Sequence, residues 1–184
     1  MFQEFVSQTS QNKTYKGYKL LAVDGSDIQI PTNLSDVESL IVTKEDSKPY
    51  NLLHLNALYN IQTHTYEDAI VFKCREAGEN KALTEMVDRS AVTEKTIVIM
   101  DRGYESYNNM AHIQEKGWSF LIRIKDNTSG ITSGLMLPYE NEFDIPFHLK
   151  LKKKQSNSVK ELLKDKNHYK AISSDARFDY LPQK

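Results

Sequence analysis

Hydrophobic and polar residues alternate in blocks along this chain, and the blocks predict short strands and helices in turn. The first apolar run, Tyr18–Val23, leads into Asp24-Gly25-Ser26, a sequence typical of a strand that stops at a turn. A brief second run, IQIP, follows it. Residues 34–48 are polar and are followed by a proline, so we expect a loop or a short helix there.

The next two apolar runs predict a long hairpin. Asn51–Gln62 could form a helix by the spacing of its leucines, but the run that follows, Thr65–Lys73, is rich in β-branched and aromatic residues. We therefore expect two strands joined by a turn near Thr63 and His64.

The pattern then changes to an alternation of helices and strands. Asn80–Ser90 has its apolar residues at helical spacing, and Thr96–Met100 is a continuous apolar run typical of a strand buried on both faces. Ser106 can cap a further helix that Gly117 stops, and Trp118–Ile124 predicts the next strand. The expected order is three strands, helix, strand, helix, strand. Beyond Lys125 only weak strand candidates remain, at 145–151 and 168–173.

Two motifs share one form, an apolar strand that runs into an aspartate and a glycine. They are LLAVDGS around Asp24 and IVIMDRG around Asp101. In the predicted order the fourth strand can lie parallel beside the first through a right-handed crossover. Neighbouring strands are about 4.8 Å apart, so the two carboxylates could share one divalent cation such as Mg²⁺. As an alternative, both aspartates are ordinary turn residues, because Asp-Gly is a common turn signal.

The net charge of −1 is unevenly distributed. Residues 148–170, the basic segment, contain eight lysines and two acidic residues, a balance of +6, so residues 1–147 carry −7. An acidic body with a basic segment suits a metal-binding enzyme that holds a polyanion. A solvated lysine-rich surface would give the same charge pattern.

Three runs of sequence, LLAVDGSDIQIP, NLLHLNALYNI and VIMDRGYESYNNMAHIQEKGWSFLIRIK, resemble the catalytic core of bacterial insertion-sequence transposases of the Asp-Asp-Glu type. The resemblance is strongest at DRGYES and the helix and strand after it. It implies a mixed α/β class with an RNase H-like fold, a five-stranded mixed sheet with flanking helices. The chain would then consist of a lead-in (1–14), a partial catalytic core (15–126) and the start of a basic β-rich insertion (127–184).

The resemblance also implies a mechanism and partners. Asp24 and Asp101 carry over as catalytic residues and metal ligands for Mg²⁺ or Mn²⁺, with two ions in the complete site. One ion would activate water or a DNA 3′-hydroxyl, and the other would stabilise the leaving oxygen. The implied partners are DNA, as transposon ends and target, and a second copy in a homodimer. We expect a cytoplasmic protein that joins the nucleoid when it is bound to DNA.

The family's third carboxylate is a glutamate on a later helix, in a pattern of tyrosine, arginine, glutamate and lysine. After Lys125, the glutamates 140, 142 and 161 have no Tyr and Arg at suitable spacing. We therefore expect an incomplete triad and an inactive chain. The family's N-terminal DNA-binding region is also expected to be missing, because the first catalytic strand begins near Tyr18.

Several other residues are candidates for contact with DNA. Arg102, Tyr104 and Glu105 flank the second aspartate and could touch a phosphate or position a metal-bound water. Lys152, Lys153 and Lys154 are candidates for backbone phosphate contacts.

Some function classes are excluded by what the sequence lacks. The single cysteine, Cys74, allows neither an internal disulfide nor a cysteine-based zinc cage. The sequence has no glycine-rich phosphate loop, no apolar run long enough for a membrane span and no signal peptide at its start. Two rival interpretations stay open: a non-catalytic transposase remnant that binds nucleic acid or a partner, and a metal-dependent nuclease of the same fold.

Overall fold

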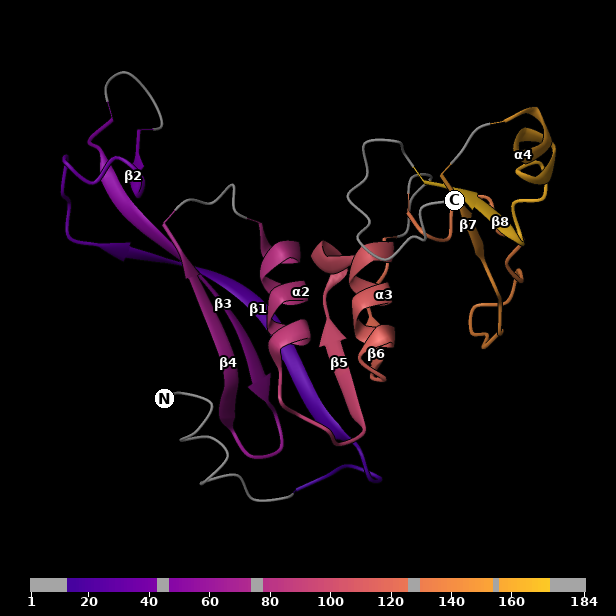
Figure 1. The fold of residues 1–184 in the computed structure, drawn as a ribbon, viewed down its shortest axis with the longest axis horizontal. Coiled ribbons are helices and arrows are strands. Elements are labelled where there is room, and N and C mark those ends of the chain that lie inside the picture. Colours follow the sequence, from indigo (N-terminus) through magenta and orange to yellow (C-terminus); the bar gives the residue numbers. More distant parts are fainter. Residues whose placement is uncertain (1–12, 43–46, 74–77, 126–129, 154–155, 173–184) are drawn as a thin grey trace. The chain divides into compact units, whose positions relative to one another are not determined.

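The computed structural model describes residues 13–42, 47–73, 78–125, 130–153 and 156–172. It divides into two compact units, Met1–Arg123 and Ile124–Lys184. The first unit is built on one mixed sheet (Figure 1). Its main strands are β1 (Lys19–Ile30), β3 (Tyr50–Asn60), β4 (Thr65–Phe72), β5 (Thr96–Met100) and β6 (Ser119–Ile122).

The strands lie in the order β4-β3-β1-β5-β6. β1, β3 and β4 are antiparallel neighbours, whereas β5 runs parallel to β1 and β6 runs parallel to β5. This is the expected mixed α/β arrangement of an RNase H-like core, and the hairpin turn lies at residues 61–64 as predicted. One detail of the prediction was wrong. Leu40–Ile41 form a short strand, β2, on the outer part of β3, so the sheet has six strands instead of five.

Two helices cover one face of this sheet, α2 (Glu79–Arg89) and α3 (Tyr107–Glu115) (Figure 1). α2 matches the predicted helix because its apolar residues recur at helical spacing and are fully buried. Ser106 caps α3 as predicted, since its hydroxyl accepts a hydrogen bond from the Asn108 N–H at 3.2 Å. The buried core between sheet and helices comprises Leu21, Val23, Leu58, Ile70, Ala82, Leu83, Met86, Val87, Val98, Met100, Tyr104, Ile113 and Trp118.

The strand predicted to stop at Asp24 continues past it. β1 pairs with β3 over ten residues, from Leu21 opposite Asn60 to Ile30 opposite Asn51, and Asp24 lies opposite Ala57 in the middle of this ladder. The Asp-Gly pair therefore forms no turn, because the partner strand supplies hydrogen bonds on both sides of it. What ends near Asp24 is the pairing with β5, whose last residue is Met100.

The second unit contains a separate two-stranded parallel sheet. Its strands are β7 (Lys150–Lys152) and β8 (Tyr169–Ala171), and the helix α4 (Asn157–Leu162) connects them. β8 falls inside the weak candidate at 168–173, whereas β7 overlaps only the end of the candidate at 145–151 and extends one residue beyond it. The helix α4 was not predicted. Within the described part of the chain, no helix has the length and apolar character needed to cross a membrane.

Candidate active site

Asp24 and Asp101 occupy equivalent positions on neighbouring parallel strands. The aligned pairs of β1 and β5 run from Lys19 with Thr96 to Ala22 with Ile99, and the partners in each pair are 77 residues apart in the chain. Asp24 and Asp101 are also 77 positions apart, and they lie two positions beyond the last aligned pair. The fold therefore brings the two predicted aspartates to the same level of the sheet, where β5 ends.

Each of these carboxylates is oriented by a backbone amide of a following glycine. The Gly25 N–H donates to Oδ1 of Asp24 at 2.9 Å, and the Gly103 N–H donates to Oδ1 of Asp101 at 2.7 Å. Both aspartates are exposed. One oxygen of each carboxylate thus accepts a hydrogen bond from the backbone, which orients the side chain.

A third carboxylate, that of Glu79, lies over the glycines that follow the two aspartates. The sequence analysis did not predict Glu79 as a candidate site residue. It is the first residue of α2, and its side chain lies over two glycines. A methyl group added at Gly25 would lie 2.7 Å from Oε1 of Glu79, and one added at Gly103 would lie 3.7 Å from Oε2. The absence of side chains at these glycines leaves the space that the Glu79 carboxylate occupies. The only sequence signal was an acidic residue in a first helical turn, which the helix dipole also favours.

His54 and Asp27 support Glu79 from the antiparallel side of the sheet. Nδ1 of His54 is 2.8 Å from Oδ1 of Asp27, its cross-strand partner, and Nε2 of His54 is 3.6 Å from Oε1 of Glu79. The His54 side chain is only 8% exposed. The contact with Asp27 fixes the imidazole so that its other nitrogen faces Glu79.

Two buried polar side chains beside the carboxylates have no hydrogen-bond partner. The Tyr104 hydroxyl is buried, and its pKa is raised by burial first and then by the charges of Glu79, Asp24 and Asp101. This phenol therefore lies within electrostatic reach of all three carboxylates. Asn56 is fully buried opposite Gly25, and neither its amide nitrogen nor its amide oxygen is bonded. Buried polar atoms without partners are uncommon, and each invites an explanation by a ligand or water.

The chemistry of these groups fits Mg²⁺ or Mn²⁺. Carboxylate oxygens are the ligands that such ions prefer, and Mg²⁺ usually takes one or two of them and keeps water and phosphate for its remaining positions. In the described ranges, no three His, Cys, Asp or Glu side chains stand close enough to hold one ion. Within these ranges, Asp24, Asp101 and Glu79 therefore do not together form a group that could hold one ion.

The other predicted contact residues divide between the two units. Arg102 is exposed in the short 3-10 helix η2 (Arg102–Tyr104), directly after Asp101. Lys152 is half-buried in β7 and Lys153 is exposed, both in the second unit. Lys154 lies outside the described residues.

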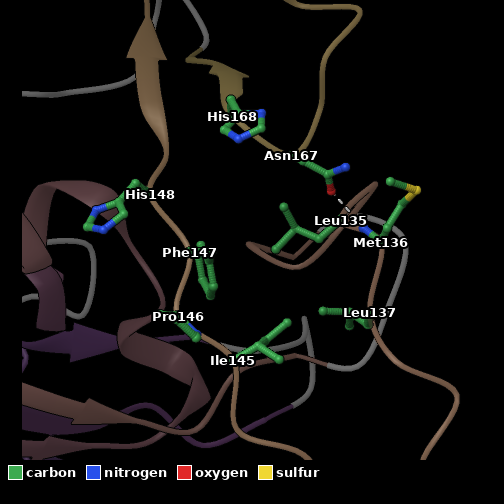
Figure 2. A pocket seen from close by; sticks show the side chains of 9 residues that line it. All are labelled: Leu135, Met136, Leu137, Ile145, Pro146, Phe147, His148, Asn167 and His168. Atoms are coloured by element: carbon green, nitrogen blue, oxygen red, sulfur yellow. Dashed lines mark hydrogen bonds between the residues drawn. The ribbon is translucent and has the colours of Figure 1, made fainter.

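The second unit also has a small pocket of about 310 Å³ (Figure 2). The lining is mainly apolar, and a hydrogen bond of 2.8 Å from the Met136 N–H to the Asn167 side chain ties two of its segments together. No carboxylate lines it. The pocket consequently offers no carboxylate oxygen to a metal ion. Its lining residues are Leu135, Met136, Leu137, Ile145, Pro146, Phe147, His148, Asn167 and His168.

Comparison with known protein families identifies the family to which the chain belongs. The sequence profile of the transposase DDE domain matches residues 15–174, which include both aspartates and most of the second unit. The chain belongs to the transposase DDE domain family. No curated protein sequence matches it. Among solved structures, a cryo-EM structure of a piggyBac transposase synaptic complex with hairpin DNA is similar, with a TM-score of 0.43 and 10% sequence identity. That alignment covers 60% of this chain and 24% of the other, so the chain spans about a quarter of the length of that transposase.

Proposed function

We propose that this member of the transposase DDE domain family contributes the two aspartates of a metal-dependent DNA cleavage and strand-transfer site. The observation that carries the proposal is the equal spacing of 77 residues, which aligns Asp24 with Asp101 beyond the paired part of β1 and β5. Two unrelated turn residues would have no reason to share one level of the sheet. Family membership supplies the reaction class, DNA transposition.

In this proposal Asp24 and Asp101 hold Mg²⁺ or Mn²⁺ through the oxygens not fixed by the glycine amides. The bound metal supplies charge stabilisation at the reacting phosphate. The glycine amides orient the two carboxylates toward the metal. Arg102 is exposed beside Asp101, where its guanidinium can contact a phosphate oxygen of the DNA. The partners are transposon-end and target DNA and a second copy of the protein, in the cytoplasm.

The reaction also needs a third carboxylate, which in this family is a glutamate on a later helix. No Tyr, Arg, Glu, Lys pattern follows Lys125 in the sequence. We therefore expect residues 1–184 to bind DNA without cutting or joining it. A form that also carries such a pattern and a DNA-binding region should cut the ends of its own element in Mg²⁺.

The test measures cleavage of DNA that carries the element ends, by residues 1–184 and by the longer form. Cleavage by the longer form should disappear in Asp24→Ala and Asp101→Ala, and Asp144→Ala, a carboxylate of the second unit, serves as the matched control. Activity that persists in both variants would refute the role of the two aspartates. Nicking by residues 1–184 that is lost in Asp101→Ala would refute only the expected inactivity, because all the necessary carboxylates would then lie within this chain.

The rival function is binding of nucleic acid without catalysis. The specific observation that favours it is the basic segment, in which Lys150, Lys153, Lys160, Lys164 and Lys166 are exposed. Phosphate contacts from exposed lysines need no catalytic site. The cleavage assay separates the two functions, since the rival predicts no cleavage by either protein.

A further inference from the structure

We propose that His54 is a positioning residue for the Asp24 carboxylate and that it acts through the backbone of Gly25. The inference rests on the proposed function, because it concerns how one of the two metal-binding aspartates is held. In it His54 contacts neither the metal nor the DNA.

Gly25 links the two faces of the sheet at this point of β1. Successive side chains of a strand point to opposite faces. Val23 is buried in the core under the helices, so position 25 faces the helices as well, and the Asp24 carboxylate between them points to the other face. A group on the helix side therefore affects Asp24 through the strand and not by direct contact. The Gly25 N–H, which donates to Oδ1 of Asp24 at 2.9 Å, is the bond that transmits the effect.

Two side chains fill the space that a side chain at position 25 would need. A methyl group added at Gly25 would lie 3.0 Å from Nε2 of His54 and 2.7 Å from Oε1 of Glu79. Real Cβ atoms essentially never approach other heavy atoms more closely than 3.0 Å. His54 and Glu79 thus lie directly against Gly25 and limit its movement toward the helices. The peptide group that carries the Gly25 N–H is held from this side.

His54 is the more firmly held of these two side chains. It is 8% exposed, and its Nδ1 is 2.8 Å from Oδ1 of Asp27, its cross-strand partner, whereas the Glu79 side chain is 41% exposed. A buried ring has little room to move in a close-packed interior. Asn56, the residue paired with Gly25 in the ladder, has neither side-chain amide atom hydrogen-bonded, so its side chain gives Gly25 no comparable support. The position of Gly25 consequently depends on His54.

The contact with Asp27 also stabilises the fold, so the test has to separate position from stability. Two variants of His54 do this, because each keeps one of its two contacts. In His54→Asn the amide nitrogen takes the place of Nδ1 and can still reach Asp27, but the contact with Gly25 is lost. In His54→Gln the amide nitrogen takes the place of Nε2 and can still reach Gly25, but the contact with Asp27 is lost.

The first measurement is the NMR chemical shift of the Gly25 amide proton in residues 1–184. A proton that donates to a carboxylate resonates downfield, and Asp24→Ala gives the reference shift without this bond. The shift should move more than halfway to this reference in His54→Asn and stay closer to the wild-type value in His54→Gln. Both variants lack the imidazole ring, so the direct effect of the ring on the shift is the same in both.

His112→Asn is the matched control for stability. His112 is a second buried histidine of the first unit, 4% exposed, with Nδ1 at 2.9 Å from Oδ1 of Asp88, and it is not among the nearest neighbours of Gly25. Its replacement should lower the free energy of unfolding, measured in urea, and leave the Gly25 shift unchanged. Equal Gly25 shifts in His54→Asn and His54→Gln would overturn the inference and leave His54 as an anchor of the fold.

The second measurement is Mn²⁺ affinity, from the loss of the free-ion signal in electron paramagnetic resonance. His54→Asn should weaken the affinity about tenfold relative to His54→Gln, as is usual when a group that orients a metal ligand is removed. Gly25→Ala, which keeps His54 but forces it and Gly25 apart, should weaken it about as far, and wild-type affinity in this variant would also contradict the inference. Wild-type affinity in Asp24→Ala would instead refute the proposed function, while the Gly25 shifts would still decide whether His54 positions the carboxylate.

Discussion

Arg89 donates two hydrogen bonds to the buried carboxylate of Asp68, from Nε to Oδ2 at 2.7 Å and from Nη2 to Oδ1 at 2.8 Å. The pair joins the last turn of α2 to β4, while Glu79 at the first turn of the same helix faces the sheet near Gly25. The helix is therefore fixed at both ends by charged residues, and its core face is fixed by apolar packing between them.

Loss of this anchor should destabilise the first unit. Arg89→Ala leaves the Asp68 side chain, 7% exposed, without its charged partner. Breaking a fully buried pair costs about 3–5 kcal/mol, and because Arg89 itself is 40% exposed we expect about 2 kcal/mol. Urea denaturation measures the change in the free energy of unfolding. Glu85→Gln, which removes only the outer contact of Arg89, should change it by less than about 0.5 kcal/mol. Equal effects of the two variants would contradict this account.

Two tyrosines should make the protein sensitive to high pH. Burial raises the pKa of Tyr104, with a further contribution from the three nearby carboxylates, and burial followed by Glu105 raises the pKa of Tyr107. A pKa raised in the folded state means that folding favours the neutral phenol. The stabilisation is fully present below the unfolded value of about 10 and is lost as the pH rises above it.

The free energy of unfolding should therefore fall as the pH rises above about 10, and it should fall less steeply in Tyr104→Phe. Below that pH the same variant should be as stable as the wild type or more so, because the hydroxyl that it removes has no hydrogen-bond partner. Denaturation curves at a series of pH values give both quantities. Tyr139→Phe, at a fully exposed tyrosine, is the control. A Tyr104→Phe variant with an unchanged alkaline slope would contradict the prediction.

The basic segment should contribute salt-sensitive, sequence-indifferent DNA binding. Replacement of Lys152 and Lys153 by alanine should make the slope of log affinity against log salt shallower by about 1 to 2, since each phosphate contact contributes about 0.9. Fluorescence anisotropy with two unrelated duplexes at several salt concentrations measures this slope. Replacement of Lys13 and Lys95, exposed lysines of the first unit, removes the same charge and should leave the slope nearly unchanged. A slope that responds equally to both pairs would indicate a general charge effect instead of a contact surface.

The strands and helices that depend on local patterns were predictable from the sequence. Thr96–Met100 became β5 with the same bounds, but the predicted burial of both faces was wrong: buried and half-buried residues alternate along the strand, because the two helices cover only one face of the sheet. The end of β1 was not predictable in this way. Asp24-Gly25-Ser26 has the local preference of a turn, and only the ladder to β3, formed by residues about 30 positions later, overrides that preference.

The same distinction explains the candidate site. Asp24 and Asp101 were predicted as site residues because each follows an apolar run, and the register of β1 with β5 gives them equivalent positions along the two strands. Glu79 could not be found because nothing in its neighbourhood distinguishes it from any acidic residue at the start of a helix. What distinguishes Glu79 is its contact with Gly25 and His54. Both are distant from it in sequence, and they come into contact with it only when α2 packs on the sheet.

The position of Asp24 inside a continuous strand determines which changes of length the site can tolerate. Asp24 is five positions after Lys19, and Asp101 is five positions after Thr96, the pairing partner of Lys19. These equal counts give the two aspartates equivalent positions along β1 and β5. An insertion or deletion of one residue within either stretch would shift the register and turn one aspartate to the opposite face of the sheet. Insertions in the connection after Ile30 would lengthen a loop and leave both counts intact. Natural variants of this chain should accordingly differ in length between residues 31 and 49 far more readily than between 19 and 24.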